Sequence, residues 1–174
     1  MFRMRPADAG DRDGVAAMVE ARAGWMRSRG MRVFDGAAET IAEQAGDPDF
    51  PVWVLEEDST VVGCTTVFED SPAWAFTEHE RAQPALFLAS TWTLPTDGRR
   101  LGHVIARWAL DHAARTGATA VRRGAFEAGL ARYYCEVQGW TLLREVERRG
   151  RTGYIMTRPA QYQPGLPVVA PVSG

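Results

Sequence analysis

The sequence predicts an α/β fold in which a mixed β-sheet is flanked by helices. Three observations support this class: apolar runs of strand length, segments with apolar residues at helical spacing, and a strand, glycine turn, helix and strand in the middle of the chain. The middle segment runs from residue 85 to 117, and a further strand is expected over 118–123. Two strands joined through one helix form a βαβ-like crossover.

The first part of the chain is expected to contribute strands and helices in alternation. A short strand over 2–5 precedes a helix that Asp8 or Asp11 can cap and that ends at Gly30. A shorter helix is expected over 38–45. Strands over 51–56 and 61–68 are rich in β-branched residues and are separated by a short polar turn, which predicts a hairpin.

The remaining segments are less regular. Residues 69–83 show no periodic pattern and read either as a variable binding loop or as a plain surface connection. A helix is expected over 129–137, and a second hairpin pairs strands that begin near 140 and 153. The tail over 159–174 holds four prolines and no helix or strand pattern, so it is expected to be mobile or draped on the surface. The chain is thus expected to be one domain, 1–158, with a tail, 159–174.

Composition excludes several classes of function. The 174 residues have a formal net charge of −2, which gives no general basic field for nucleic acid. No apolar run approaches the ~20 residues of a membrane span, and the N-terminus lacks the apolar core of a signal peptide. All basic side chains apart from histidine are arginines. Two cysteines and three histidines show no metal-ligand spacing. A cytoplasmic protein without a metal, a membrane or a nucleic-acid partner is therefore expected.

The turn in the middle segment has the chemistry of an anion site. The first backbone N–H groups of a helix have no partner within the helix, and the helix dipole adds partial positive charge there. Residues 96–102 bring two glycines and two arginines to this place. A phosphate can accept those N–H groups where no side chain blocks its approach. A tight surface turn with solvated arginines is the alternative.

Three features together resemble the GCN5-related N-acetyltransferase (GNAT) family over nearly all of residues 1–158. These are the order of elements, the segment Gly98–Gly102 followed fifteen residues later by Gly117, and the segment Leu130–Trp140. The resemblance implies an acyl-CoA N-acyltransferase fold with a splayed mixed sheet. It also implies transfer of an acetyl group from acetyl-CoA to a primary amine of a small molecule or peptide, by direct attack in a ternary complex.

The resemblance also implies which residues form the site. Backbone groups of one strand would hold the thioester and the pantetheine, the loop and first helical turn would hold the pyrophosphate, and one residue would lie near the cofactor thiol. A tyrosine, Tyr134, would protonate the leaving thiolate. The residues implied for acetyl-CoA are Trp92, Thr93, Leu94, Arg99, Arg100, Leu101, Gly102, His103, Val104 and Glu127.

Two departures from the family pattern stand out. If Gly102 takes the second glycine position of the loop, the first position holds Arg100; if Arg99 heads the motif, Gly102 is the first glycine and Val104 replaces the second. The helix length favours the former register, and one glycine is absent in both. Tyr134 precedes Gly139 by five residues where the family usually has four, and Cys135 occupies the usual spacing. A local bulge would restore Tyr134, and Tyr133 is the second choice for the acid.

Several alternatives stay open. The base that deprotonates the amine could be Glu69, Asp70, Glu78, His79 or Glu127, and no spacing selects among them. The same fold could belong to a non-catalytic acyl-CoA-binding or interaction protein, or to a transferase that uses a longer acyl donor. The acceptor and the oligomeric state, including a homodimer, are not decided by the sequence.

Overall fold

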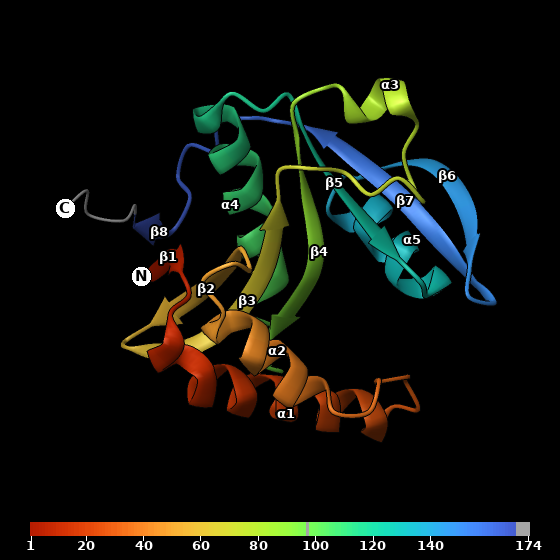
Figure 1. Cartoon of the computed structure of the whole chain (residues 1–174). Helices are drawn as coiled ribbons and strands as arrows, with labels where there is room; N and C mark the ends of the chain where they lie inside the picture. Colours follow the sequence, from red (N-terminus) through yellow and green to blue (C-terminus); the bar gives the residue numbers. More distant parts are fainter. Residues whose placement is uncertain (97, 170–174) are drawn as a thin grey trace. The chain divides into compact units, whose positions relative to one another are not determined.

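A computed structural model describes residues 1–96 and 98–169 (Figure 1). Asp97 in the expected turn and residues 170–174 of the expected tail lie outside the described residues. Contacts divide the chain into two compact units. Unit 1 comprises residues 1–66, 90–105 and those from Leu166 onward, and unit 2 comprises residues 67–89 and 106–165.

The described residues contain eight strands in the order β6-β7-β5-β4-β3-β2-β1-β8. The strands are β1 (Phe2–Pro6), β2 (Val52–Glu57), β3 (Thr60–Phe68), β4 (Ala85–Thr93), β5 (Ala120–Ala125), β6 (Thr141–Arg148), β7 (Arg151–Pro159) and β8 (Val168–Val169). The helices are the 3-10 turn η1 (Ala9–Asp11), α1 (Arg12–Ser28), α2 (Ala37–Gly46), α3 (Glu78–Arg81), α4 (Leu101–Thr116) and α5 (Ala128–Val137). Parallel and antiparallel pairs both occur, so the predicted mixed sheet flanked by helices is confirmed.

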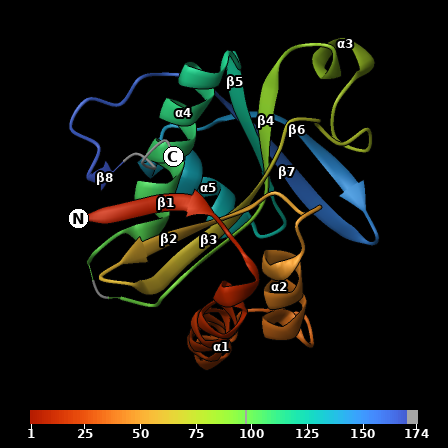
Figure 2. The same ribbon diagram turned by 60° about the vertical axis from the view of Figure 1, so that its left-hand side comes forward.

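In unit 1, β1, β2 and β3 form an antiparallel sheet. Asp58 and Ser59 join β2 to β3 with φ of 48° and 63°, the left-handed conformations of a tight hairpin turn. Helices α1 and α2 lie side by side against this sheet (Figures 1 and 2). Val15 and Val19 of α1 and Ile41 of α2 belong to the same buried cluster as residues of β2 and β3, so apolar burial fixes both helices on the strands.

The start of α1 uses both predicted capping residues. The Asp8 carboxylate accepts the Gly10 N–H at 2.8 Å and the Asp11 carboxylate accepts the Asp8 N–H at 2.9 Å, which forms a capping box around η1. Arg5 of β1 donates two hydrogen bonds of 2.8 Å to the Asp11 carboxylate. Because these bonds stabilise the anion, they hold the pKa of Asp11 below its ordinary value.

In unit 2, the first half of β4 pairs in parallel with β5, from Ala85 opposite Ala120 to Leu88 opposite Arg123. Helix α4 connects these strands, which confirms the predicted βαβ crossover. β5 also pairs antiparallel with β7, and β7 forms a hairpin with β6. The side chain of Ile155 on β7 is fully buried at the centre of this unit.

Two expectations for the irregular segments are wrong. Residues 69–83 are not wholly irregular, because Glu78–Arg81 form α3, capped by Thr77 and Glu80 in a capping box. The tail is not free of strands, because β7 continues to Pro159 and β8 pairs in parallel with β1. A helix of one turn and a strand of two residues are too short to produce a periodic pattern.

The part of the tail that precedes β8 is draped on unit 2. The Gln161 N–H donates to the Leu110 carbonyl at 3.1 Å, and the Gln163 N–H donates to the Asp111 carboxylate at 2.9 Å. Both acceptors lie on α4. The expectation that the tail lies along the surface is therefore confirmed for these residues.

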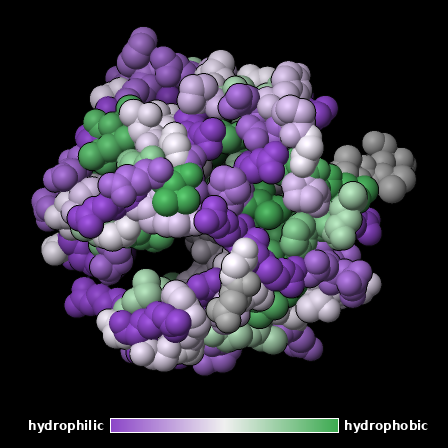
Figure 3. Space-filling model, turned by 180° about the vertical axis from the view of Figure 1, so that it is seen from behind, coloured by the Kyte–Doolittle hydropathy of each residue, from purple (hydrophilic) through white to green (hydrophobic). Residues whose placement is uncertain are grey.

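The surface in Figure 3 is mostly hydrophilic, with hydrophobic residues in several separate areas. Within residues 1–96 and 98–169, no helix has both the length and the apolar character that crossing a membrane requires. Nor do three His, Cys, Asp or Glu side chains gather as a metal site in the described part of the chain.

We predict that Gly63→Ala destabilises the protein. A Cβ on Gly63 of β3 would lie 3.0 Å from the Ile105 Cδ1 and 3.2 Å from the Trp92 carbonyl oxygen, and the backbone cannot yield as a flexible side chain can. Overpacking of this kind costs about 1–3 kcal/mol, which urea denaturation would measure. Gly24→Ala is the control, because a Cβ there meets nothing within 4 Å. Equal stability of the two variants would contradict the close packing at Gly63.

Candidate functional site

The loop that enters α4 adopts the left-handed backbone that glycine favours. Gly98 has a φ of 74° and Arg100 a φ of 49°. The Arg100 carbonyl accepts the N–H groups of His103 and Val104 at 2.9 and 3.2 Å, which closes the first turn of the helix. Arg100 therefore occupies the conformation for which a glycine was expected, and the arginine tolerates it at a cost of about 1–2 kcal/mol.

The first turn of α4 is open on its outer side. A Cβ placed on Gly102 would meet nothing within 4 Å. The side chains of Leu101 and Val104 are buried, so a ligand at this turn would meet backbone groups. Arg99 pairs with the Glu57 carboxylate, and its guanidinium carbon lies 5.6 Å from the centre of the Phe2 ring. The loop thus presents an open helix N-terminus, which suits an anion, while the Arg99 charge is shared with Glu57.

The last residues of β4 are held by a side chain that the sequence did not indicate. Arg22 of α1 donates from Nε to the Thr93 carbonyl at 2.7 Å, and from Nη2 to the Thr93 hydroxyl and the Leu94 carbonyl at 2.9 and 3.1 Å. The Trp92 ring packs edge-on against Phe34, with ring centres 6.3 Å apart. The strand end next to the loop is therefore fixed from outside the sheet. One arginine within a helix carries no pattern that would reveal this role.

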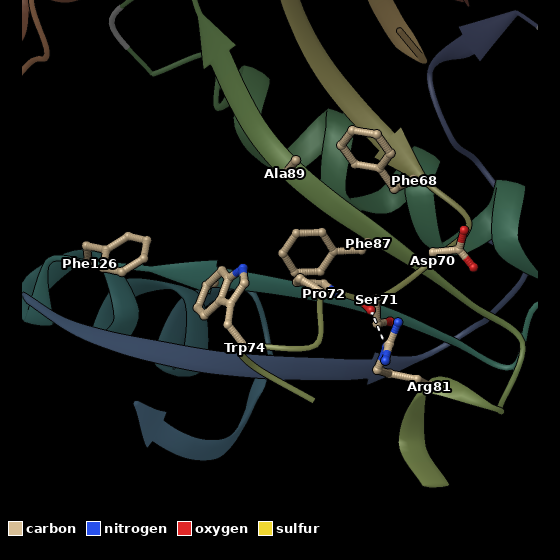
Figure 4. A pocket seen from close by; sticks show the side chains of 10 residues that line it. Phe68, Asp70, Ser71, Pro72, Trp74, Arg81, Phe87, Ala89 and Phe126 are labelled. Carbon is tan, nitrogen blue, oxygen red and sulfur yellow. Dashed lines mark hydrogen bonds between the residues drawn. The ribbon is translucent and has the colours of Figure 1, made fainter. Parts of the chain in front are cut away.

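A cavity of about 470 Å³ begins in unit 2 where the pairing of β4 with β5 ends (Figure 4). Ala89 and Gly124, the residues that follow the last pair, both line it. The other lining residues are Phe68, Asp70, Ser71, Pro72, Trp74, Arg81, Phe87 and Phe126. Of the five carboxylate and histidine candidates for the base, Asp70 is the one that lines this cavity.

Arginines from the sheet clamp the segment between β3 and β4. Arg122 is buried and donates to the Ser71 hydroxyl and the Glu80 carbonyl, each at 2.9 Å. Arg144 of β6 donates to the Glu80 carboxylate and to the Ala75 carbonyl at 2.8 and 2.9 Å. Burial lowers the pKa of Arg122 from its ordinary value. The segment is thus a fixed wall of the cavity.

Tyr134 of α5 is tied to a buried arginine of β5. Arg123 donates from Nη2 to the Tyr134 hydroxyl at 2.9 Å, and its guanidinium carbon lies 3.9 Å from the centre of the Tyr134 ring. The Trp140 ring lies near the same guanidinium, at 5.3 Å. Burial lowers the pKa of Arg123. Tyr133, in contrast, is 39% exposed. The sequence showed Arg123 only as part of a strand.

The end of α5 is wider than a standard helix end. The Tyr134 carbonyl accepts the Gln138 N–H and also the Trp140 N–H, both at 3.1 Å. The second bond joins residues six positions apart in the sequence, whereas the usual glycine-terminated helix end joins residues five positions apart. Gly139 has a φ of 76°. The extra residue between Tyr134 and Gly139 is accommodated here.

The other candidate residues of the sequence are placed at the surface. Glu127 precedes α5, is exposed and pairs with Arg151 at 2.9 Å. Glu69, Glu78 and His79 are exposed and do not line the cavity.

No family model and no curated protein matches the chain. Solved structures do match it. An acetyltransferase of the GNAT family from Listeria monocytogenes matches with a TM-score of 0.68 and 17% identity, over 91% of this chain and 94% of that chain. The chain has the GNAT fold. At this identity the likeness concerns the fold, and it confirms the fold that the resemblance in the sequence predicted.

Two further GNAT-fold neighbours were solved with a coenzyme. A putative acetyltransferase from Salmonella typhimurium, with its cofactor acetyl-CoA, matches with a TM-score of 0.56 and 17% identity over 95% of this chain and 97% of that one. The PaiA N-acetyltransferase from Thermoplasma acidophilum, in complex with coenzyme A, has a TM-score of 0.61 and 12% identity over 91% of this chain and 99% of that one.

We predict that Glu80→Gln destabilises the protein in a pH-dependent way. The hydrogen bond from Arg144 lowers the pKa of Glu80 from 4.5 to about 2. The ion pair therefore stabilises the fold above pH 4.5, and its contribution is lost as the pH falls toward 2. The variant should lose about 1 kcal/mol of unfolding free energy at pH 7, as expected for a partly exposed pair.

Denaturant titrations between pH 7 and pH 2 would measure this difference. Glu78→Gln, an exposed position on the same helix, is the control and should change little. If the loss at pH 7 persisted unchanged at pH 2, the assignment of the stabilisation to this ion pair would be wrong.

Proposed function

We propose that the protein is an N-acetyltransferase that moves an acetyl group from acetyl-CoA to a primary amine. The observation that carries the proposal is the entry to α4 in a chain of GNAT fold. Gly98 and Arg100 take left-handed conformations there, and the open side of Gly102 leaves the first turn accessible. We therefore interpret the loop as a pyrophosphate site and not as a solvated surface turn, because a surface turn does not require an open helix N-terminus.

The residues of unit 1 fit the coenzyme in two ways. The N–H groups of Leu101 and Gly102 at the start of α4 can be offered to a pyrophosphate, with Arg100 as a positive charge beside them. His103 and Val104, whose N–H groups donate to the Arg100 carbonyl, would complete the turn that holds this site, and Arg99 would have to leave Glu57 to reach the anion. The strand end at Trp92 and Thr93 is where we place the pantetheine amides, which would pair with it as an added strand does. Leu94 anchors this end, because its N–H donates to the Val62 carbonyl and its carbonyl accepts from Arg22. Arg22, bound to the carbonyls of Thr93 and Leu94, holds this edge in place.

The transfer conserves atoms and charge. Acetyl-CoA supplies an acetyl group activated as a thioester. The amine nitrogen forms a bond to the acetyl carbon, the carbon–sulfur bond breaks, the amine loses a proton and the sulfur gains one. The ordinary pKa of a primary amine is ~10.4, so it must lose a proton before it can attack at neutral pH. Two proton transfers therefore need groups from the protein.

Tyr134 is the group that we assign to the sulfur. Its hydroxyl oxygen accepts a hydrogen bond from Arg123, so its own proton can be directed to another acceptor. The widened end of α5 supports Tyr134 over Cys135 as the acid. Tyr134 lies one residue farther from Gly139 than in the family pattern, and the wider helix end accommodates that extra residue. For the amine proton we assign Asp70, which lines the cavity.

Coenzyme binding without transfer is the second candidate function. Arg100 favours it, because a side chain stands where the family has a glycine and a backbone amide would have to approach the pyrophosphate past it. Binding of acetyl-CoA together with the absence of thiol release for every amine tested would establish this reading.

We predict that Gly102→Val weakens acetyl-CoA binding at least tenfold without changing the melting temperature by more than a few degrees. The new side chain starts from a Cβ that meets nothing within 4 Å and extends into the open side of the α4 first turn. Gly129→Val is the matched control, since Gly129 is also the second residue of a helix with open space beside it. Calorimetric titration would measure both affinities, and equal binding by the two variants would contradict the anion site.

We predict that Tyr134→Phe lowers kcat by about 100-fold or more, the usual contribution of a general acid, with little change in acetyl-CoA affinity. Tyr133→Phe should keep the rate of the unaltered protein because Tyr133 is exposed. Release of free thiol with a panel of primary amines would measure turnover. Full rates in both variants would show that neither tyrosine is the acid.

A further inference from the structure

The cavity of unit 2 is built for a flat apolar group. Four aromatic side chains, Phe68, Trp74, Phe87 and Phe126, line it together with Pro72 (Figure 4). They come from the end of β3, the segment after β3, β4 and the residue after β5. Its volume of about 470 Å³ lies within the range of small-molecule sites. Aromatic walls bind planar apolar groups through burial and ring stacking.

The aromatic walls are held in place from behind. Trp74 stacks on Phe126 with ring centres 6.1 Å apart and an interplanar angle of 29°. The Arg148 guanidinium lies 4.2 Å from the centre of the Trp74 ring, and that of Arg151 lies 5.3 Å from the centre of the Phe126 ring. Phe87 meets Phe76 edge-on at 5.9 Å. Because contacts within the protein already hold these rings, binding costs little further side-chain entropy.

Two side chains of opposite charge line the cavity. Asp70 contributes a carboxylate from the segment after β3. Arg81 contributes a guanidinium, whose Nε donates to the Ser71 carbonyl at 3.0 Å, and both charged side chains are exposed. Figure 4 shows Asp70 and Arg81 on the same side of the cavity, with Trp74 and Phe126 on the other. The guanidiniums of Arg148 and Arg151 already lie over the Trp74 and Phe126 rings, so the Asp70 carboxylate is the group of the lining that can pair with a protonated amine.

The cavity begins where the pairing of β4 with β5 ends. Ala89 and Gly124, two small residues, line it directly after the last β4–β5 pair. We propose that the acceptor is an arylalkylamine, a primary amine carried on a flat aromatic body that lies between these rings. The proposal rests on the proposed function for the transfer itself, but the binding of such an amine can be measured separately.

Binding of 2-phenylethylamine would test the proposal, with ethylamine as the probe that lacks the ring and 3-phenylpropionate as the probe of opposite charge. Calorimetric titrations would be made with and without saturating coenzyme A, since the amine site can depend on the coenzyme. We expect 2-phenylethylamine to bind at least tenfold more tightly than either other probe. Ethylamine or 3-phenylpropionate binding as tightly would overturn the proposal.

Two variants locate the site. Ala89→Leu on β4 fills the cavity and should weaken 2-phenylethylamine binding at least tenfold. Ala82→Leu, an exposed alanine in the segment before β4 that does not line the cavity, should leave the binding unchanged. Asp70→Asn should abolish the preference over 3-phenylpropionate and keep the preference over ethylamine. Unchanged binding in Ala89→Leu, with the melting temperature retained, would contradict the assignment of the cavity.

Turnover separates this proposal from the proposed function. If 2-phenylethylamine binds as expected but is never acetylated, the cavity assignment stands and the transferase assignment fails. If other amines are acetylated while 2-phenylethylamine neither binds nor reacts, the transferase assignment stands and the acceptor proposal fails. The acceptor proposal also fails if 2-phenylethylamine does not bind and Ala89→Leu weakens the binding of hexanoyl-CoA more than that of acetyl-CoA. The cavity would then hold an acyl chain.

Discussion

The structure depends on a strand that is paired with β5 over only part of its length. The register of β4 with β5 runs over four residue pairs and ends at Leu88 and Arg123, although β4 continues to Thr93. Backbone groups inside a protein need partners, so a strand that leaves its neighbour must find others. Near the end of β4 these are the Val62 carbonyl and the Arg22 guanidinium. The cavity begins where the pairing with β5 stops.

Unit 2 contains two consecutive buried arginines, which is unusual because a buried charge loses its hydration. Arg122 and Arg123 point to different partners, since successive side chains of a strand face opposite sides. Arg122 donates to Ser71 and Glu80, and Arg123 donates to Tyr134. Desolvation lowers the pKa of both. Guanidinium groups tolerate such places because they are weakly hydrated and stack on rings.

The sequence predicted the fold better than the site. In strands and helices of ordinary length, the spacing of apolar residues indicated the type of element. Gly98, Gly102 and Gly117 marked the start and end of α4. Arg22, Arg123 and the rings of the cavity could not be found in this way. Their roles come from residues that are distant in sequence and meet only after folding, such as Phe68 and Phe126. The choice of Asp70 among five carboxylates and histidines likewise needed the position of the cavity, because exposed acidic residues look alike in a sequence.

Arginines supply the positive charges in unit 2: two stack on Trp74 and Phe126, and two others bind Glu80 and Tyr134. The sequence contains no lysine, so none of its side chains carries a primary amine. Guanidinium groups stay protonated at physiological pH and are poor nucleophiles toward thioesters. The charged framework around the cavity is therefore inert to an acyl donor that would slowly modify lysine side chains in the same places.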